Sequence, residues 1–315
     1  MRAVLLDHIT RAEEIRLTQV PTPEAQPGWV LVQVKAFGLN HSEQILRLSE
    51  IEADYIQKPI IPGIECAGVV ADPSDSGLAQ GQKVIAMMGG MGRSFHGSYA
   101  EYALLPKQNV FPVQTDLPWE RLGAIPETYF TAWGSLFECL QLKKEDCLLI
   151  RGATCALGYA AMQLAKALGC QVVATTHRAE KLPLLQAADE ALLDDGGLSS
   201  KGLAVTKVLD LVGPRYLRDS LRTVLHGGIV CATGILGGVF ALNGFDPIKE
   251  IPNGVYLTGF FSNYPTRAVV EDLFAFLNTH ALAPTLGMCY HFDEIAAACL
   301  AQDQGKADGK IVVVL

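Results

Sequence analysis

The chain has 315 residues, half of them hydrophobic, with a formal net charge of −8 and a sequence pI near 5.4. The length predicts about two domains with sizeable cores, and the acidic balance argues against nucleic acid or an anionic membrane surface as the main partner. No stretch resembles a signal sequence or a transmembrane helix, and the eight cysteines include no CxxC pair, so we expect reduced thiols in a cytoplasmic protein.

The first 117 residues read as short strands separated by proline and glycine clusters. The candidate strands cover residues 3–6, 29–38, 67–71, 81–88 and 97–105. Many short strands with turn residues between them predict an antiparallel, barrel-like β domain.

A turn-rich segment at residues 114–122 leads into helical sequence at 127–140, which places a domain boundary near Leu117. An amphipathic helix at 267–282, a second helical segment at 292–302 and a last strand at 310–315 follow, and we expect that strand to return to the first domain. The predicted domains are therefore 1–117 with 265–315, and 118–264.

The second domain opens with a buried strand at Leu148–Ile150, a tight turn and a helix of small residues from Leu157 to Gly169. Free backbone N–H groups at such a helix N-terminus hold a pyrophosphate, and we assign this role to the turn residues Thr154, Cys155, Ala156 and Leu157. In register with GxGxxG, however, the glycine positions hold Ala153, Cys155 and Gly158, so the turn could also be an ordinary strand–turn–helix.

Strands and helices alternate from this turn to residue 262, which predicts a Rossmann-type doubly wound parallel sheet with helices on both faces. At the end of its second strand, residues 174–177 include no carboxylate that would favour NAD. Thr175, Thr176, Arg178 and Lys181 could instead surround a 2′-phosphate, which predicts NADP(H). A basic helix start on the surface is the alternative interpretation.

Six motifs in order resemble the medium-chain dehydrogenase/reductase superfamily over nearly the whole chain, and its zinc-independent quinone oxidoreductase branch most. The motifs are GLNHSE at 38–43, PGIECAGVV at 62–70, GSYAEYALLP at 97–106, PETYFTAW at 126–133, the turn and helix at 152–166, and DGKIVVVL at 308–315. The resemblance implies a GroES-like, mostly antiparallel β-barrel beside the Rossmann domain, with the active site in the cleft between them.

Zinc-dependent relatives take metal ligands at positions that here hold Asn40, Ile64 and Glu127. An amide and an aliphatic side chain do not make a tetrahedral zinc site, and residues 86–98 lack the cysteine cluster of a structural zinc lobe. We therefore predict no metal, which weakens the reading as an alcohol dehydrogenase.

The resemblance places Asn40 beside the nicotinamide, where its amide would donate a hydrogen bond to the reduced substrate oxygen. Ser42 and Glu127 could shuttle a proton, and Tyr129 could contribute a hydroxyl group. Each has a structural alternative: Asn40 as a turn residue, Ser42 and Glu127 as helix caps, and Tyr129 as packing.

Buried Glu65 should pair with a cation, and the resemblance suggests Lys310, near the cofactor pyrophosphate; a lysine at a strand entrance is the plainer interpretation. The remaining cofactor contacts that the resemblance implies are Thr131, Leu211, Thr233, Gly234 and Phe261.

Together these features predict an NADPH-dependent oxidoreductase that acts on a quinone or an α,β-unsaturated carbonyl, without a metal. A non-catalytic NADP(H)-binding redox sensor or scaffold is the alternative from a different class. We also expect a homodimer, because the late strands at 227–234 and 255–261 have the character of exposed sheet edges.

Overall fold

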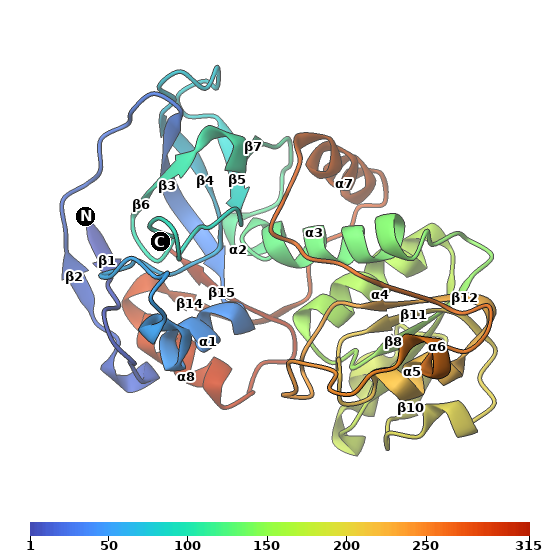
Figure 1. Cartoon of the computed structure of the whole chain (residues 1–315). Helices are drawn as coiled ribbons and strands as arrows, with labels where there is room; N and C mark the ends of the chain where they lie inside the picture. The colour runs from blue at the N-terminus through green and yellow to red at the C-terminus, as the bar shows by residue number, and fades with distance from the viewer. The chain divides into compact units, whose positions relative to one another are not determined.

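The computed structural model describes all 315 residues, and the chain divides into two compact units (Figure 1). Unit 1 comprises Met1–Phe130 with Asn263–Leu315, and unit 2 comprises Thr131–Ser262. The first division falls inside α3 (Pro126–Trp133) and not near Leu117, because Trp119 of the preceding helix packs with the unit 1 residues Ala36 and Val312.

Unit 2 is built on one sheet of six parallel strands, in the order β10-β9-β8-β11-β12-β13. The strands are β8 (Cys147–Arg151), β9 (Gln171–Thr176), β10 (Glu190–Leu193), β11 (Val205–Asp210), β12 (Val224–Ala232) and β13 (Tyr256–Gly259). Counted along the chain, this is the doubly wound order 3-2-1-4-5-6, which confirms the predicted Rossmann-type sheet. The order reverses between β8 and β11.

Helical segments precede or connect these strands. They are the π-helix η4 (Gly134–Cys139), α4 (Ala156–Leu168), the 3-10 helices η5 (Ala179–Leu185) and η6 (Leu198–Ser200), α5 (Leu217–Thr223) and α6 (Pro247–Glu250). Helix α4 ends where predicted, because Gly169 adopts φ 92°, a left-handed conformation that suits glycine. The helix expected at 127–140 is instead α3 followed directly by η4.

Unit 1 contains a sheet of seven strands, in the order β14-β15-β3-β4-β5-β7, with β6 also paired to β3. They are β3 (Trp29–Gly38), β4 (Glu65–Asp72), β5 (Lys83–Met87), β6 (Tyr102–Pro106), β7 (Val110–Pro112), β14 (Leu286–His291) and β15 (Lys310–Val314). All of the pairings are antiparallel except β14 with β15. The last strand, β15, pairs with β3 (Figure 1), so the chain returns to the sheet that its first part forms.

A two-stranded antiparallel sheet of β1 (Arg2–Val4) and β2 (Leu17–Gln19) completes the strands of unit 1. Its helices are η1 (Ala12–Glu14), α1 (His41–Leu48), η2 (Glu50–Glu52), η3 (Lys107–Asn109), α2 (Trp119–Leu122), the start of α3, α7 (Arg267–Thr279), η7 (Phe292–Glu294) and α8 (Ile295–Asp303). The core joins strand residues such as Val32 to Ala298 of α8, so both ends of the chain share one hydrophobic core.

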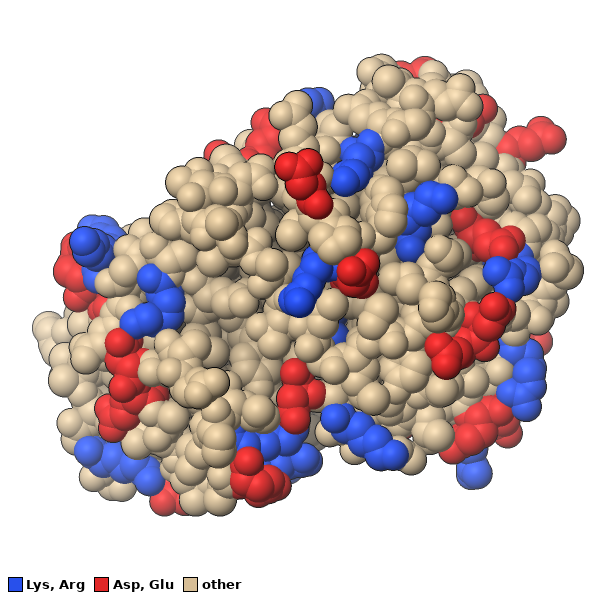
Figure 2. All heavy atoms as spheres, turned by 180° about the vertical axis from the view of Figure 1, so that it is seen from behind, with Lys and Arg blue, Asp and Glu red and all other residues tan.

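Acidic and basic side chains are interspersed on the face that Figure 2 shows, without a continuous basic field. This distribution agrees with the net charge of −8 and offers no footprint for a polyanion on that face. No helix of the structure is both long enough and apolar enough to cross a membrane.

Candidate functional site

A buried ion pair lies at the centre of the polar cluster in unit 1. The Lys310 ammonium is 2.6 Å from Glu65 Oε1, and both side chains are almost completely buried, with 3% and 0% exposed. This contact confirms the predicted partner of Glu65. It ties the first residue of β15 to the first residue of β4, and the burial of two charges is tolerable because each has further hydrogen-bond partners.

Asn40 and Thr128 supply those further partners. Lys310 Nζ donates to Asn40 Oδ1 over 2.5 Å and to Thr128 Oγ1 over 2.8 Å, while Asn40 Nδ2 donates to Glu65 Oε1 over 2.9 Å. The Glu127 backbone N–H donates to Glu65 Oε2 over 2.7 Å. The cluster therefore joins the start of α1, the start of α3 and the last strand around one carboxylate.

Glu43 holds Asn40 from the other side, in a capping arrangement at the start of α1. Glu43 Oε2 accepts the Asn40 backbone N–H over 2.8 Å, and Oε1 accepts the Ile64 backbone N–H over 3.0 Å. The pKa of Glu43 is raised to about 7, mainly by burial; the charge of Glu65 adds to the rise, and the Ile64 hydrogen bond and Lys310 act against it. The carboxyl group of Glu43 therefore titrates near neutral pH.

Glycine is required at Gly38, the last residue of β3. A Cβ atom there would overlap Lys310 Cε and lie 2.5 Å from Glu65 Oε1. The motif GLNHSE therefore provides both the space for the ion pair, through Gly38, and the side chains that complete it, through Asn40 and Glu43.

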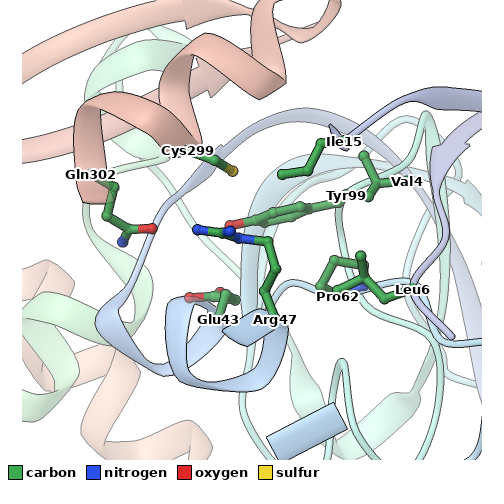
Figure 3. Close-up of a pocket in the computed structure, with 9 residues that line it drawn as sticks. All are labelled: Val4, Leu6, Ile15, Glu43, Arg47, Pro62, Tyr99, Cys299 and Gln302. Carbon is green, nitrogen blue, oxygen red and sulfur yellow. The ribbon is translucent and has the colours of Figure 1, made fainter. Parts of the chain in front are cut away.

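A small cavity lies behind Glu43, between α1 and α8 (Figure 3). The Arg47 guanidinium and the Tyr99 hydroxyl group point into the same region, and Cys299 and Gln302 close it from α8 (Figure 3). Arg47 donates to the Thr10 carbonyl and to Asp303, and these bonds fix its position. The carboxyl group of Glu43 therefore has polar neighbours on this side also.

Ser42 does not join the Asn40 cluster. Its hydroxyl oxygen accepts a hydrogen bond from Arg93 Nη2 over 2.9 Å, and the same guanidinium pairs with Glu50 over 2.6 Å. Arg93 thereby anchors the segment between β5 and β6 on α1 and η2. The structure gives Ser42 a part in this anchor, which leaves the proposed proton relay unsupported.

Tyr129 is 2% exposed, and burial raises the pKa of its phenol group. A buried phenol with a raised pKa is a poor proton donor at neutral pH, so the packing role is the better supported of the two.

His41 is exposed and contacts Gln44, whereas His96 accepts a hydrogen bond from the Ile61 N–H over 3.2 Å.

The positions that bear metal ligands in zinc-dependent relatives do come together in this fold. Asn40 and Glu127 both contact Glu65, and the N–H of Ile64 contacts Glu43. Their donor set does not suit zinc, because Ile64 offers no ligand atom and the Asn40 amide is engaged by its neighbours. No group of three or more histidine, cysteine, aspartate or glutamate side chains in the structure could hold a metal ion.

In unit 2, the turn between β8 and α4 has the close packing of a dinucleotide-binding turn. A Cβ atom at Gly158 would overlap the Ala153 carbonyl, so the third motif glycine lets α4 pack directly on the turn. Cys155, at the position of the second glycine, is the helix N-cap, and its thiol accepts the Gly158 N–H over 3.3 Å. Burial raises the pKa of Cys155, so the cap is a neutral thiol.

The loops that follow β11 and β12 also pack closely against each other. Asp210, buried at the end of β11, accepts the N–H groups of Val212 and Gly213 over 2.9 and 2.8 Å. A Cβ atom at Gly213 would overlap the Gly234 carbonyl, and one at Gly234 would overlap Leu211. The loops after β11 and β12 therefore approach each other through backbone atoms.

A buried arginine fixes this edge of the sheet from within. Arg151, the last residue of β8, is 0% exposed and makes two hydrogen bonds to Asp194, at 2.7 and 3.0 Å. It also pairs with Asp219 over 2.9 Å and donates to Ser220, whose hydroxyl group bonds to Asp210. The network connects the carboxyl ends of β8, β10 and β11, and the strand order reverses between β8 and β11.

The two threonine side chains at the end of β9 are buried, and their hydroxyl groups contact the turn after β8. Thr175 Oγ1 accepts the Gly152 N–H over 3.2 Å, and Thr176 Oγ1 lies 3.1 Å from Thr154 Oγ1. Arg178 is exposed just beyond the strand, and its Nε donates to His177 over 3.3 Å. Lys181 follows in η5.

These features fit a nicotinamide dinucleotide. Such ligands bind at the carboxyl edge of a parallel sheet, where the strand order reverses. This edge carries the α4 N-terminus and the close backbone turns at Gly158 and Gly234. Thr233 lies at the same edge, and its N–H donates to the Asp210 carbonyl over 3.0 Å. Thr131 precedes η4 and accepts a hydrogen bond at its carbonyl from Ser135, whereas Phe261 is exposed beyond β13.

Sequence reasoning missed several residues that organise these sites. Glu43 and Thr128 complete the Asn40 cluster, and Arg151 with Asp194 holds the nucleotide edge. Asn followed three residues later by Glu is a helix-start pattern that could have identified Glu43. No local pattern indicates Arg151, because its partners come from distant segments.

Comparison with known proteins supports a nicotinamide-binding dehydrogenase fold. Residues 26–115 match the family model of the alcohol dehydrogenase GroES-like domain, and residues 186–313 match that of the zinc-binding dehydrogenase. Human quinone oxidoreductase is 27% identical over 334 residues, which cover 100% of this chain and 98% of the relative.

Two solved structures show the same fold over the whole chain. An NAD-dependent alcohol dehydrogenase has a TM-score of 0.87 and 24% identity, with 100% of each chain covered. A mycobacterial protein complexed with NADPH has a TM-score of 0.85 and 22% identity, with 100% of this chain and 100% of that chain covered.

The two family models match successive parts of the chain, and the two solved structures share its fold. The chain therefore belongs to the medium-chain dehydrogenase/reductase superfamily of oxidoreductases, in its quinone oxidoreductase-like branch.

Proposed function

We propose that the protein is a metal-independent, NADPH-dependent reductase of quinones or α,β-unsaturated carbonyl compounds. One observation carries the proposal: at the position of a metal ligand in zinc-dependent relatives stands Asn40, held by Lys310, Glu65 and Glu43 in a cluster of hydrogen-bonding groups. When bound, the nicotinamide supplies the hydride. A conjugated acceptor needs no Lewis acid, so hydrogen-bond donors suffice to stabilise the reduced oxygen.

The residues of the cluster would act by orientation and charge. Lys310 holds the Asn40 amide oxygen, which turns the amide N–H groups toward the carboxylates of Glu43 and Glu65. A substrate oxygen would compete for the longer of these contacts, the 3.4 Å contact with Glu43. Glu43, with its pKa near 7, could then supply a proton to the neighbouring hydrogen-bond network.

For the cofactor, we propose NADPH over NADH. The end of β9 carries Thr175, Thr176 and then Arg178, and it lacks the carboxylate that would bind a ribose 2′-hydroxyl group and repel a 2′-phosphate. One similar protein is complexed with NADPH and another is NAD-dependent, so the choice rests on the residues at the end of β9.

A non-catalytic NADP(H)-binding protein is the second candidate, and one observation favours it. Both ends of the Asn40 amide are engaged: Nδ2 with Glu65 and Glu43, and Oδ1 with Lys310. An amide fixed in this way could serve structure alone. The two candidates differ in turnover.

Steady-state oxidation of NADPH against a panel of quinones and enals distinguishes them. Turnover with at least one acceptor, undiminished after treatment with a chelator, is expected of the reductase. Tight NADPH binding without oxidation by any acceptor would support the sensor or scaffold, and loss of turnover after chelation would indicate a metal enzyme.

We also propose a homodimer formed at the edge of the unit 2 sheet. Of the two late strands, β12 is paired on both sides and only β13 is an edge, so the expectation for β12 was wrong. Tyr256 on β13 is 62% exposed, which suits a strand that meets a partner. Sedimentation velocity at micromolar concentration should give a dimer, and a monomer would refute the proposal.

A further inference from the structure

Two thiols of unit 2 form a pair at the contact between η4 and β12. The hydroxyl groups of Ser135 and Thr233 lie 2.9 Å apart and mark one contact between the helix and the strand. Cys139 follows Ser135 by four residues, about one turn of the π-helix η4, and Cys231 precedes Thr233 by two residues, about 6.6 Å along a strand. The two cysteines therefore occupy the next contact along the same interface.

The individual contacts agree with this placement. The Cys139 thiol donates to the Gly259 carbonyl over 3.5 Å, and Gly259 on β13 is in register with Ala232, the neighbour of Cys231 on β12. The Cys231 thiol lies 3.3 Å from Thr233 Oγ1, and Cys139 is among the neighbours that raise the pKa of Cys231. Neither cysteine forms a disulfide bond in the structure.

The two thiols differ in accessibility. Cys231 is 0% exposed, and burial raises its pKa to about 12, whereas Cys139 is partly exposed. Because the thiolate is the reactive form and an oxidant must reach it, Cys139 is the thiol that reacts first. Cys231 is then the thiol that resolves the oxidised intermediate.

We propose that Cys139 and Cys231 are a redox-modification site, a thiol pair that hydrogen peroxide converts reversibly into a disulfide. The Cys139 sulfur attacks one peroxide oxygen, the O–O bond breaks, and one water leaves with the thiol proton. Cys231 then attacks the sulfenic sulfur, the S–S bond forms, the S–O bond breaks, and the second water leaves. Two thiols lose two electrons and two protons, and one peroxide becomes two waters.

The disulfide would change the carboxyl end of β12. The bond draws Cys139 toward Cys231, so Cys139 gives up its contact with Gly259 and Cys231 gives up its contact with Thr233. Thr233 and Gly234 begin the loop that packs against Leu211. As far as these loops bind a nicotinamide, which rests on the proposed function, oxidation should weaken NADPH binding several-fold.

The test treats the full-length protein with hydrogen peroxide, blocks remaining thiols, and maps the peptides by mass spectrometry without reduction. The expected result is a Cys139–Cys231 disulfide that dithiothreitol reverses. Cys139→Ser should abolish it, and Cys231→Ser should leave a sulfenic acid at Cys139 that dimedone traps. Cys289→Ser removes an exposed thiol of β14 and should leave the disulfide unchanged.

Two further measurements test how the disulfide changes stability and NADPH binding. The disulfide closes a loop of roughly ninety residues, so the oxidised protein should unfold at a higher urea concentration. NADPH fluorescence titration should show several-fold weaker binding after oxidation, restored by dithiothreitol.

Peroxide that oxidises Cys139 without linking it to Cys231, or that links either to another cysteine, would overturn the proposed site. An unchanged NADPH affinity in the oxidised protein would overturn its effect on the cofactor loops. A reduced protein that does not bind NADPH would instead refute the proposed function, and the peptide map would still decide the disulfide.

Discussion

The Lys310 ammonium donates a hydrogen bond to the Asn40 amide oxygen over 2.5 Å, although the two residues lie 270 positions apart in the chain. The same ammonium pairs with Glu65, so the last strand, the first helix and β4 meet at one buried charge. The position of Asn40 therefore depends on the C-terminal strand, and this dependence can be tested through stability.

Lys310→Met should destabilise the protein by about 3–5 kcal/mol, because it leaves the Glu65 carboxylate buried without its cation. Urea unfolding at neutral pH measures the change. The double variant Lys310→Met with Glu65→Gln should recover part of the loss, and Lys306→Met, at an exposed lysine, should change stability little. A loss below about 1 kcal/mol in Lys310→Met would show that the pair does not hold the strand.

Glu43 should make stability depend on pH between its unfolded and folded pKa values, 4.5 and about 7. In this range the folded state holds a proton that the unfolded chain has released. The free energy of unfolding should therefore fall as pH rises from about 4.5 to 7, by up to about 3 kcal/mol, and level off above the folded pKa.

Glu43→Gln should remove this slope, whatever its effect on the absolute stability. Unfolding free energies of both proteins at several pH values from 4.5 to 8 provide the comparison. Parallel curves for the two proteins would mean that Glu43 titrates normally in the folded state.

Asn40→Ala should lower kcat by about 10², the scale of a lost hydrogen-bond donor at a developing negative charge, while the Kd for NADPH changes little. Transient and steady-state kinetics separate these quantities. If NADPH affinity collapses and turnover per bound cofactor stays the same, Asn40 is a cofactor-binding residue and does not act on the substrate.

Replacement of Arg178 and Lys181 by alanine should reduce the preference for NADPH over NADH by about 2 kcal/mol, the scale of charged hydrogen bonds to a phosphate. The ratio of specificity constants for the two cofactors measures it. Lys143→Ala, an exposed lysine elsewhere in unit 2, is the matched control. Equal use of both cofactors by the unmutated protein would contradict the assignment.

The sequence predicts much of the fold because its patterns are local. The strand at Leu148–Ile150, the stop at Gly169 and the strand β9 follow from periodicity and from glycine, and the structure reproduces all three. The strand β14 escaped prediction because its pattern is irregular, and η4 was predicted as an ordinary helix because its composition is helical.

The site depends on contacts that no local pattern encodes. The motif positions identify Asn40, but its hydrogen bonds come from Lys310, Glu65 and Glu43, two of which are distant in sequence. Ser42 has the residue type of a proton relay, and its actual partner is Arg93, in a loop whose path the sequence does not reveal. Residue types therefore suggested the roles, and tertiary packing decided among them.

A single-turnover experiment with NADPH deuterated at the transferred position of the nicotinamide ring tests the proposed hydride transfer most directly. With the protein in excess over NADPH, a quinone or enal acceptor should oxidise the bound cofactor, and the deuterated cofactor should react more slowly. Bound NADPH that stays reduced in the presence of every quinone and enal would contradict the proposed reductase.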